Sequence, residues 1–260
     1  TSINELFKNQ LAGKINTKRV AFGIPASRTF NRVVKLPKLN AKELTDAIRL
    51  EAEQYIPMPV DQLYLDHVVL SQTEEELELF AVAVPKAIVD SYMTLAHLLD
   101  LEAAAMETTI AATARVFVET DRSDLPTILI DFGSISTDIT IFDKTLLVTG
   151  TVQGGGDNFT SLIAKKLGIS PEEAHIIKTK YGLRHSKKQE AITQVLTPLL
   201  EQMVKEIRRM QRYYEDRYIG DNRKIGQIVV MGGGSNVPGI SEYLTNELRL
   251  PVRSSAPWEH

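Results

Sequence analysis

Three features of the sequence predict an α/β fold. Apolar runs typical of buried strands stand at 128–130 and 225–231, and an apolar stripe at helical spacing runs through 191–218. Glycines follow both runs, Gly133 shortly after the first and Gly232–Gly234 directly after the second. Strand, glycine turn and helix in this order favour a sheet covered by helices, which is the α/β class.

The composition is that of an ordinary globular protein. The chain has 260 residues, 43% hydrophobic and 24% charged, enough for a sizeable core in one large or two medium domains. Its net charge of −3, from 30 basic and 33 acidic residues, favours neither nucleic acid nor an anionic membrane. Cysteine is absent, which excludes disulfides and thiolate chemistry. Because no apolar run approaches the roughly 20 residues that span a bilayer, we expect a cytoplasmic protein.

The first hundred residues divide into two predicted parts. Helical spacing over 3–12 is followed by a buried strand at 19–24. From 26 to 100 the pattern is strand, helix, two strands, helix, typical of a small sheet with helices on one side. Asn40 and Glu43 have the spacing of a capping box, which marks a helix start. The predicted elements are strands at 30–36, 63–70 and 77–84 and helices at 41–54 and 85–99.

The central stretch contains two tight turns around one hairpin. The apolar run 128–130 stops at a turn signal from Asp131 to Ser134, and two further strands lead to Gly154–Gly156. A helix is predicted from Asn158 to Leu167. Near the end of the chain, a third glycine turn precedes a helix that we expect to begin at Pro238.

Such turns suit phosphate groups. Glycine lets the backbone approach an anion, and the N–H groups at a helix N-terminus point at it. The hydroxyls of Ser136 and Thr137 can donate hydrogen bonds, while the carboxylates of Asp131 and Asp138 can hold Mg²⁺ directly or through water. The residues alone equally allow an ordinary hairpin, in which Asp157 caps the following helix.

Three motifs in order resemble the actin/Hsp70-like ATPase superfamily. They are DFGSISTDIT, GGGDNFT and VVMGGGSNVPGI. These are similar to the second phosphate loop, the glycine turn after it and the adenosine loop of that superfamily. The resemblance implies an actin-like (ribonuclease H-like) fold of two lobes that bind ATP between them.

Two further stretches resemble one family within the superfamily. LEAEQYIPMPVDQLYLDHVVL (50–70) and ISPEEAHIIKTKYG (169–182) are similar to the PilM family of type IV pilus assembly proteins, relatives of the division protein FtsA. The likeness runs from about Lys18 to Val252. It implies that the N-terminal phosphate loop and the C-terminal final helix of the first lobe are missing. The implied parts are 1–25 and 101–120 for the first lobe, 26–100 for an inserted α+β subdomain, 126–160 and 225–260 for the core of the second lobe, and 161–224 for a helical subdomain.

The resemblance also implies a site for ATP and Mg²⁺. Glu107 would position an attacking water, although the residues alone favour a first-turn glutamate that stabilises the helix dipole. In relatives a Glu-x-x-Lys motif contacts the ribose and the base; Lys178 matches its lysine, whereas His175 stands in place of the glutamate. The expected Mg²⁺ ligands are Asp131 and Asp138. The expected nucleotide-binding residues are Asp131, Gly133, Ser136, Thr137, Gly154, Gly155, Gly156, Asp157, Lys178, Gly232, Gly233, Gly234 and Ser235.

The implied function is an ATP-binding platform of type IV pilus assembly, at most a weak ATPase. In the family, a groove beside the inserted subdomain receives the N-terminal cytoplasmic tail of the membrane pilus protein PilN, here expected near Tyr55, Ile56, Pro57 and Met58. The protein would then reach the inner face of the membrane only through its partner, with homo-oligomers also possible. Two alternatives are an FtsA-like filament-forming division protein and an active phosphotransferase of the Hsp70/sugar-kinase type.

Overall fold

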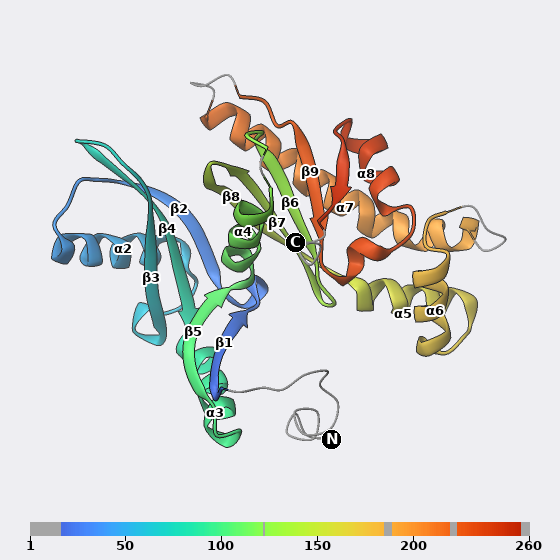
Figure 1. Cartoon of the computed structure of the whole chain (residues 1–260), viewed down its shortest axis with the longest axis horizontal. Coiled ribbons are helices and arrows are strands. Elements are labelled where there is room, and N and C mark those ends of the chain that lie inside the picture. Colours follow the sequence, from blue (N-terminus) through green and yellow to red (C-terminus); the bar gives the residue numbers. More distant parts are fainter. Residues whose placement is uncertain (1–16, 122, 185–188, 219–222, 256–260) are drawn as a thin grey trace.

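The computed structural model describes residues 17–121, 123–184, 189–218 and 223–255. The strands of these residues form three sheets, which Figure 1 shows together. A strand pair holds β1 beside β5, a small sheet has the order β2-β4-β3, and a large sheet has the order β10-β9-β6-β7-β8. The helix α4 lies between the small and the large sheet (Figure 1).

The strand pair is parallel and mostly exposed. The strand predicted at 19–24 is present, but its predicted burial is wrong, because only Ile24 is fully buried. In the described part of the chain no third strand joins this pair, so few neighbours cover it. The helix predicted over 3–12 lies outside the described residues. The elements here are β1 (Arg19–Ile24), α3 (Lys86–Leu98), β5 (Glu102–Thr108) and α4 (Thr109–Thr120).

The small sheet is antiparallel, with β4 in its centre. Its helix α2 begins as predicted, since the Asn40 side chain accepts from the Glu43 N–H and the Glu43 carboxylate accepts from the Asn40 N–H. The elements are η1 (Ala26–Arg28), β2 (Phe30–Pro37), α2 (Ala41–Tyr55), η2 (Val60–Gln62), β3 (Leu63–Gln72) and β4 (Glu76–Pro85).

The two faces of the small sheet have different neighbours. On one face, Leu79 and Ala83 pack against α2 through Ile48 and Ala52. On the other face, Phe80 joins a cluster with residues of α4 and β8. Alternate residues of β4 therefore belong to different cores, which explains the long apolar run in its sequence.

The large sheet combines an antiparallel meander with two parallel strands, since β10 in turn runs parallel to β9. β6, β7 and β8 are antiparallel neighbours, and β9 runs parallel to β6. The predicted strand at 128–130 continues to Phe132, because Asp131 pairs with Asp138 and Phe132 with Thr137 across the ladder. Thr137 therefore lies in β7, not in the turn. The strands are β6 (Thr127–Phe132), β7 (Ser136–Asp143), β8 (Thr145–Gln153), β9 (Gln227–Met231) and β10 (Val252–Ser254).

Helices cover this sheet with the largest core of the described residues. The apolar stripe of the longest helix packs into it, including Leu196, Leu200 and Ile207. Two helix starts differ from prediction: one begins at Gly156 instead of Asn158, and another at Ile240, because Gly239 is still left-handed at φ 87°. The elements are α5 (Gly156–Leu167), α6 (Pro171–Lys180), α7 (Gln189–Arg217), η4 (Gly233–Asn236) and α8 (Ile240–Leu248).

Candidate functional site

The three glycine turns meet at one edge of the large sheet. The N–H of Gly156 donates to the carbonyl oxygen of Gly133 at 3.0 Å, which joins the second turn to the first. The third turn follows β9, whose carboxyl end lies beside that of β6 because the two strands are parallel. Gly232 consequently lies against Asp131 and Phe132. The carboxyl edge of a sheet is the usual place for a ligand in this fold class.

Two of these turns require glycine for contact reasons. A Cβ on Gly155 would lie 2.4 Å from the carbonyl oxygen of Gly133, and one on Gly232 would lie 2.3 Å from Oδ1 of Asp131. Gly232 also has a φ of 78°, in the left-handed region that favours glycine. The turns approach one another more closely than any side chain would allow.

The two predicted Mg²⁺ ligands face each other across β6 and β7. Burial raises the pKa of both carboxyls, and the nearby charge of Asp138 further raises the pKa of Asp131. Both oxygens of Asp138 accept hydroxyl hydrogen bonds, from Thr109 and Thr151 at 2.8 Å each. Oδ2 of Asp131 accepts from Thr113 at 3.2 Å. A cation would therefore compete with hydroxyl donors for these oxygens.

A cation at this pair would need ligands beyond acidic side chains. Among the described residues, no cluster of three or more histidine, aspartate or glutamate side chains is placed to hold a metal. Mg²⁺ commonly takes one or two carboxylates and completes its shell with water and phosphate oxygens. The Asp131–Asp138 pair fits that ligand set, and would not suit a metal that needs a full protein cage.

Two of the expected nucleotide-binding residues with hydroxyl groups, Thr137 and Ser235, donate to carbonyl oxygens of the protein. Oγ1 of Thr137 donates to the carbonyl oxygen of Gly154 at 3.0 Å and is buried, so it holds the second glycine turn in place. The hydroxyl of Ser235 donates to the carbonyl oxygen of Gly232 at 2.7 Å. Ser136 opens β7 and is half-buried, whereas Asp157 is exposed in the first turn of α5.

Lys178 lies behind the second glycine turn. Its Nζ donates to the carbonyl oxygen of Gly156 at 2.8 Å and to Oγ1 of Thr160 at 2.9 Å, and only 6% of the residue is exposed. Burial lowers the pKa of this amine, and the charge of Asp157 opposes that effect. Lys178 belongs to α6, so its hydrogen bonds hold the first turn of α5 against α6.

Glu107 lies apart from the glycine turns. It stands near the end of β5, and its carboxylate forms an ion pair with Arg115. Arg115 and Thr113 are two residues apart on α4, so they lie about 200° apart around the helix, on nearly opposite sides. The hydroxyl of Thr113 contacts Asp131, so the Arg115 partner of Glu107 lies on the side of α4 that faces away from that aspartate. The first turn of α4 contains no acidic residue, and Thr108 caps it, so the interpretation of Glu107 as a first-turn glutamate is wrong.

The segment predicted to bind a partner lies on the α2 face of the small sheet. Ile56 is 5% exposed within the core that Ala52 and Leu63 form there, and Tyr55 and Met58 pack against the same core. The guanidinium of Arg32 lies 4.9 Å from the centre of the Tyr55 ring. This segment therefore contributes mainly to packing of the small sheet against α2.

An apolar cavity of about 320 Å³ opens on the other face of the same sheet, toward β5 and α4. Tyr64 and Val68 of β3 line it and are 48% and 60% exposed. Sequence reasoning missed these residues. The available signal was that strand 63–70 carries apolar residues on both faces, more than one buried face requires. The lining residues are Ile24, Tyr64, Asp66, His67, Val68, Phe80, Val82, Val84, Val89, Met106, Glu107, Thr108 and Ala111.

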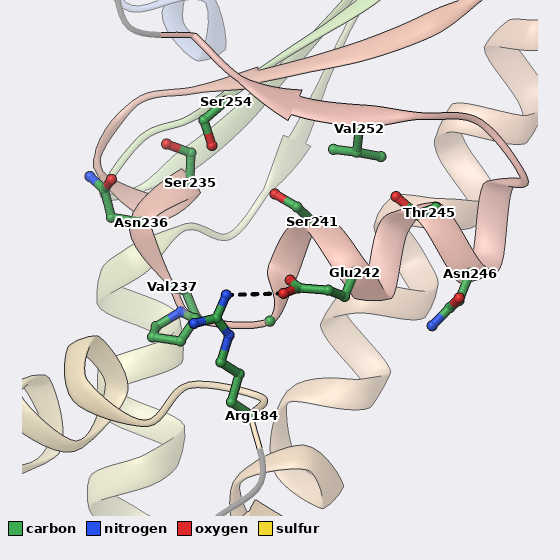
Figure 2. A pocket seen from close by; sticks show the side chains of 12 residues that line it. Arg184, Ser235, Asn236, Val237, Ser241, Glu242, Thr245, Asn246, Val252 and Ser254 are labelled. Carbon is green, nitrogen blue, oxygen red and sulfur yellow. Dashed lines mark hydrogen bonds and ion pairs between the residues drawn. The ribbon is translucent and has the colours of Figure 1, made fainter.

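A second, polar cavity of about 660 Å³ lies beside the third glycine turn, and Figure 2 shows its lining. Ser235 and Asn236 border it on one side, and Thr245 of α8 borders it on another (Figure 2). Arg184 and Glu242 form an ion pair across its mouth at 3.0 Å. The polar side chains that line this cavity suit a hydrophilic ligand group.

Within the described ranges, no helix combines the length and apolar character needed to cross a bilayer.

A family model described as type IV pilus assembly protein PilM matches residues 2–260. The chain belongs to this family. The solved structure of a PilM-PilN type IV pilus biogenesis complex matches with a TM-score of 0.79 and 23% identity, covering 94% of this chain and 71% of the other. MreB5 of Spiroplasma citri, in a structure with bound AMPPNP, matches with a TM-score of 0.53 and 18% identity over 66% of this chain and 60% of the other.

The division protein FtsA of Neisseria meningitidis serogroup B is 25% identical over 174 residues, which are 57% of this chain and 40% of FtsA. The chain spans less than half the length of the curated relatives that it matches. Membership of the PilM family and the likeness to the PilM-PilN complex and to MreB5 confirm the predicted actin-like α/β fold.

Proposed function

We propose that the chain is an ATP-binding platform of type IV pilus assembly that holds the N-terminal tail of a membrane-anchored, PilN-like protein. The observation that carries this proposal is the apolar cavity between the small sheet and β5. Exposed apolar side chains gathered in a concave site are typical of peptide and ligand binding. Family membership and the likeness to the PilM-PilN complex support a pilus tail as the peptide. Such a partner would bring the protein to the inner face of the membrane.

The cavity favours a tail with apolar residues and a basic group. Val68, Val82 and Met106 offer apolar surface, and the carboxylates of Asp66 and Glu107 stand among the lining residues. A lysine, an arginine or the free amino terminus of the tail would pair with Asp66, whereas the Glu107 carboxylate already pairs with Arg115. Tyr55, Ile56 and Met58 pack on the α2 side of the sheet, and Pro57 is exposed there, so the proposed role of this segment is indirect.

ATP and Mg²⁺ fit the edge where the glycine turns meet. Gly133, Gly154–Gly156 and Gly232–Gly234 carry no side chain at this edge, and the positive end of the α5 helix dipole lies there. The N–H groups of Gly156 and Asp157 donate to the carbonyl oxygens of Gly133 and Ser134, so the helix dipole is what would attract a phosphate group. Asp131 and Asp138 would hold Mg²⁺, directly or through water. The base would lie toward Ser235 and the polar cavity beside it. The AMPPNP bound to MreB5, a protein of the same fold, supports this assignment.

Nucleotide and tail are expected to influence each other. A ligand shifts a conformational equilibrium only by its differential affinity for the two states, and the effect on the second ligand is reciprocal. ATP bound to the glycine turns of the large sheet would change the packing of that sheet against α4 and the small sheet. A pull-down with the tail of the membrane pilus protein, with and without ATP, is expected to recover different amounts.

Substitutions on the two faces of the small sheet test the tail site. Val68 and Leu50 are each 60% exposed, but Val68 lines the cavity and Leu50 lies on α2. Val68→Glu is expected to weaken binding of a synthetic tail peptide at least tenfold, because it puts a charge on the apolar contact surface. Leu50→Glu is expected to leave the affinity unchanged in calorimetry. Equal affinity for both variants would contradict the assignment.

An FtsA-like filament is the second candidate, which the identity to FtsA over 57% of the chain favours. It predicts longitudinal contacts between copies and pelleting on addition of ATP. Sedimentation with and without ATP separates the candidates, since only the filament candidate predicts ATP-dependent pelleting.

A further inference from the structure

One hydroxyl connects the predicted Mg²⁺ site to the start of the small sheet. Oγ1 of Thr109, the first residue of α4, donates to Oδ2 of Asp138 at 2.8 Å. The same oxygen accepts from the N–H of Ala26 at 3.0 Å. Asp138 belongs to the large sheet, and Ala26 begins η1, which leads into the small sheet. Thr109 thus contacts both neighbours through one side-chain atom.

Each end of this chain of hydrogen bonds adjoins a proposed binding site. Asp138 is 8% exposed, and its other oxygen is held by Thr151. Ala26 is 3% exposed and lies two residues after Ile24, which lines the tail cavity. The backbone between Ile24 and Ala26 is short, so a displacement of the Ala26 N–H changes the cavity wall.

The first turns of α4 also contact both sites through opposite faces. Thr109 and Thr113 are four residues apart on one face and point at the two aspartates. Thr108 and Ala111 line the tail cavity. Apolar contacts seat this part of the helix firmly, because Ile110 and Ala114 pack with Ala26, Phe80 and Leu146. A rotation or shift of the start of α4 would therefore change the contacts at the two aspartates and the wall of the tail cavity.

The chemistry of a hydroxyl makes this contact exclusive. A threonine hydroxyl has one proton to donate, and Asp138 receives it in this structure. A cation bound at Asp138 competes for the same carboxylate oxygens, whose lone pairs already accept from two hydroxyls. If a bound cation drew Oδ2 of Asp138 away, the Thr109 hydroxyl would need another acceptor, and any shift of its Oγ1 would also move the acceptor of the buried Ala26 N–H.

We propose that Thr109 is a positioning residue that couples nucleotide binding at the glycine turns to tail binding in the apolar cavity. This inference rests on the proposed function, because it assigns the regulation of those two sites. It does not place Thr109 in contact with nucleotide or tail. Removal of its hydroxyl should leave each ligand able to bind alone and remove the influence of one on the other.

The test measures tail-peptide affinity by calorimetry with and without saturating ATP–Mg²⁺. The wild-type ratio of the two affinities is expected to lie roughly between 5- and 150-fold, the usual range of coupling between sites. Thr109→Val, which keeps the shape but not the hydroxyl, is expected to bring the ratio to about 1. Thr109→Ser retains the hydroxyl and should restore coupling, an outcome that a purely steric role would not give. Thr109→Ala is the second variant if valine prevents folding.

A matched control removes another threonine hydroxyl from the same helix. Oγ1 of Thr120 donates only within α4, to the carbonyl oxygen of Val116 at 2.8 Å. Thr120→Val should therefore keep the wild-type ratio. Coupling that survives in Thr109→Val and Thr109→Ala would overturn the inference, as would a wild-type protein that binds both ligands independently. Failure of the wild-type protein to bind tail or nucleotide would instead contradict the proposed function, and the inference with it.

Discussion

The large and the small sheet differ in how completely helices cover them. The large sheet has a core on one face that α7 fills, and α4 packs on its other face through Phe117 against Leu129 and Val229. The small sheet has α2 on one face, whereas an open apolar cavity remains on part of the other. Figure 1 shows α2 beside the small sheet, α7 beside the large sheet and α4 between the two sheets.

The difference indicates what each sheet has available for binding. A sheet covered on both faces offers only its strand ends and turns, where backbone N–H groups and a few polar side chains suit an anion. A half-covered sheet offers side-chain surface, which suits an apolar peptide segment. The same fold can therefore keep a nucleotide and a polypeptide partner at separate sites, with α4 between them.

The largest expected effect comes from the covered face of the small sheet. Leu79 is fully buried among residues such as Leu36 and Ile48. Leu79→Ala should lower the free energy of unfolding by about 2–5 kcal/mol through the cavity that it leaves. Urea denaturation measures this loss. Val68→Ala on the open face should cost well under 1 kcal/mol, since Val68 is exposed. Similar losses at both positions would show that the two faces are equally packed.

A second prediction concerns the strand ends of the large sheet. Gly155→Ala puts a Cβ 2.4 Å from the backbone oxygen of Gly133, so it should cost about 1–3 kcal/mol of stability and weaken ATP binding. Gly233 is the matched control, because a Cβ there meets nothing within 4 Å. Thermal unfolding of the two variants compares them. Equal stability would mean that the turns are not in close contact.

A smaller effect is expected from the charge of Asp131. Burial raises the pKa of this carboxyl in the folded state, so the folded state binds more protons than the unfolded state just above the ordinary pKa of 3.8. Because of this difference in bound protons, the free energy of unfolding of the wild type falls as pH rises through that window. Asp131→Asn removes this difference, so the variant should gain stability relative to wild type between acidic and neutral pH. It should also lose Mg²⁺-dependent ATP binding.

Melting temperatures across pH, without nucleotide, measure the first part of that prediction. A constant difference between Asp131→Asn and wild type over the whole range would contradict it. Calorimetry with ATP, in the presence and absence of Mg²⁺, measures the second part. Unchanged Mg²⁺ dependence would remove Asp131 from the site.

The smallest effect is expected at the mouth of the polar cavity. Arg184 and Glu242 form an ion pair whose side chains are 67% and 60% exposed. Exposed pairs of this kind contribute between 0 and about 1 kcal/mol. Arg184→Ala should therefore shift the urea midpoint only slightly, and high salt should reduce the shift further. A loss above 2 kcal/mol would show that this rim is part of the core.

Local signals in the sequence predicted a large part of the fold. The capping box at Asn40 places one helix correctly, because such a cap depends on residues only three apart. The glycine turns were recognisable for the same reason. The sequence also indicates their order, and the parallel pairing of β6 with β9 brings them together.

Long-range contacts explain what the sequence did not reveal. The hydroxyl partners of Asp138 come from Thr109 and Thr151, 29 and 13 residues away, and no local pattern connects them. The segment 55–58 was expected to form a binding surface because residues 50–70 resemble the PilM family. Its burial depends on α2 and β4, and only the folded small sheet reveals which of its two faces remains open.

Methionine-methyl NMR tests the central claim most directly, because the chain carries a reporter on each face of the small sheet. Met106 lines the open cavity, Met58 packs on the α2 side, and Met203 lies in the core of the large sheet. Addition of the tail peptide of the membrane pilus protein should shift the Met106 signal and leave Met58 and Met203 in place. A shift at Met58 with Met106 unchanged would contradict the account, because the tail would then bind the opposite face of the small sheet.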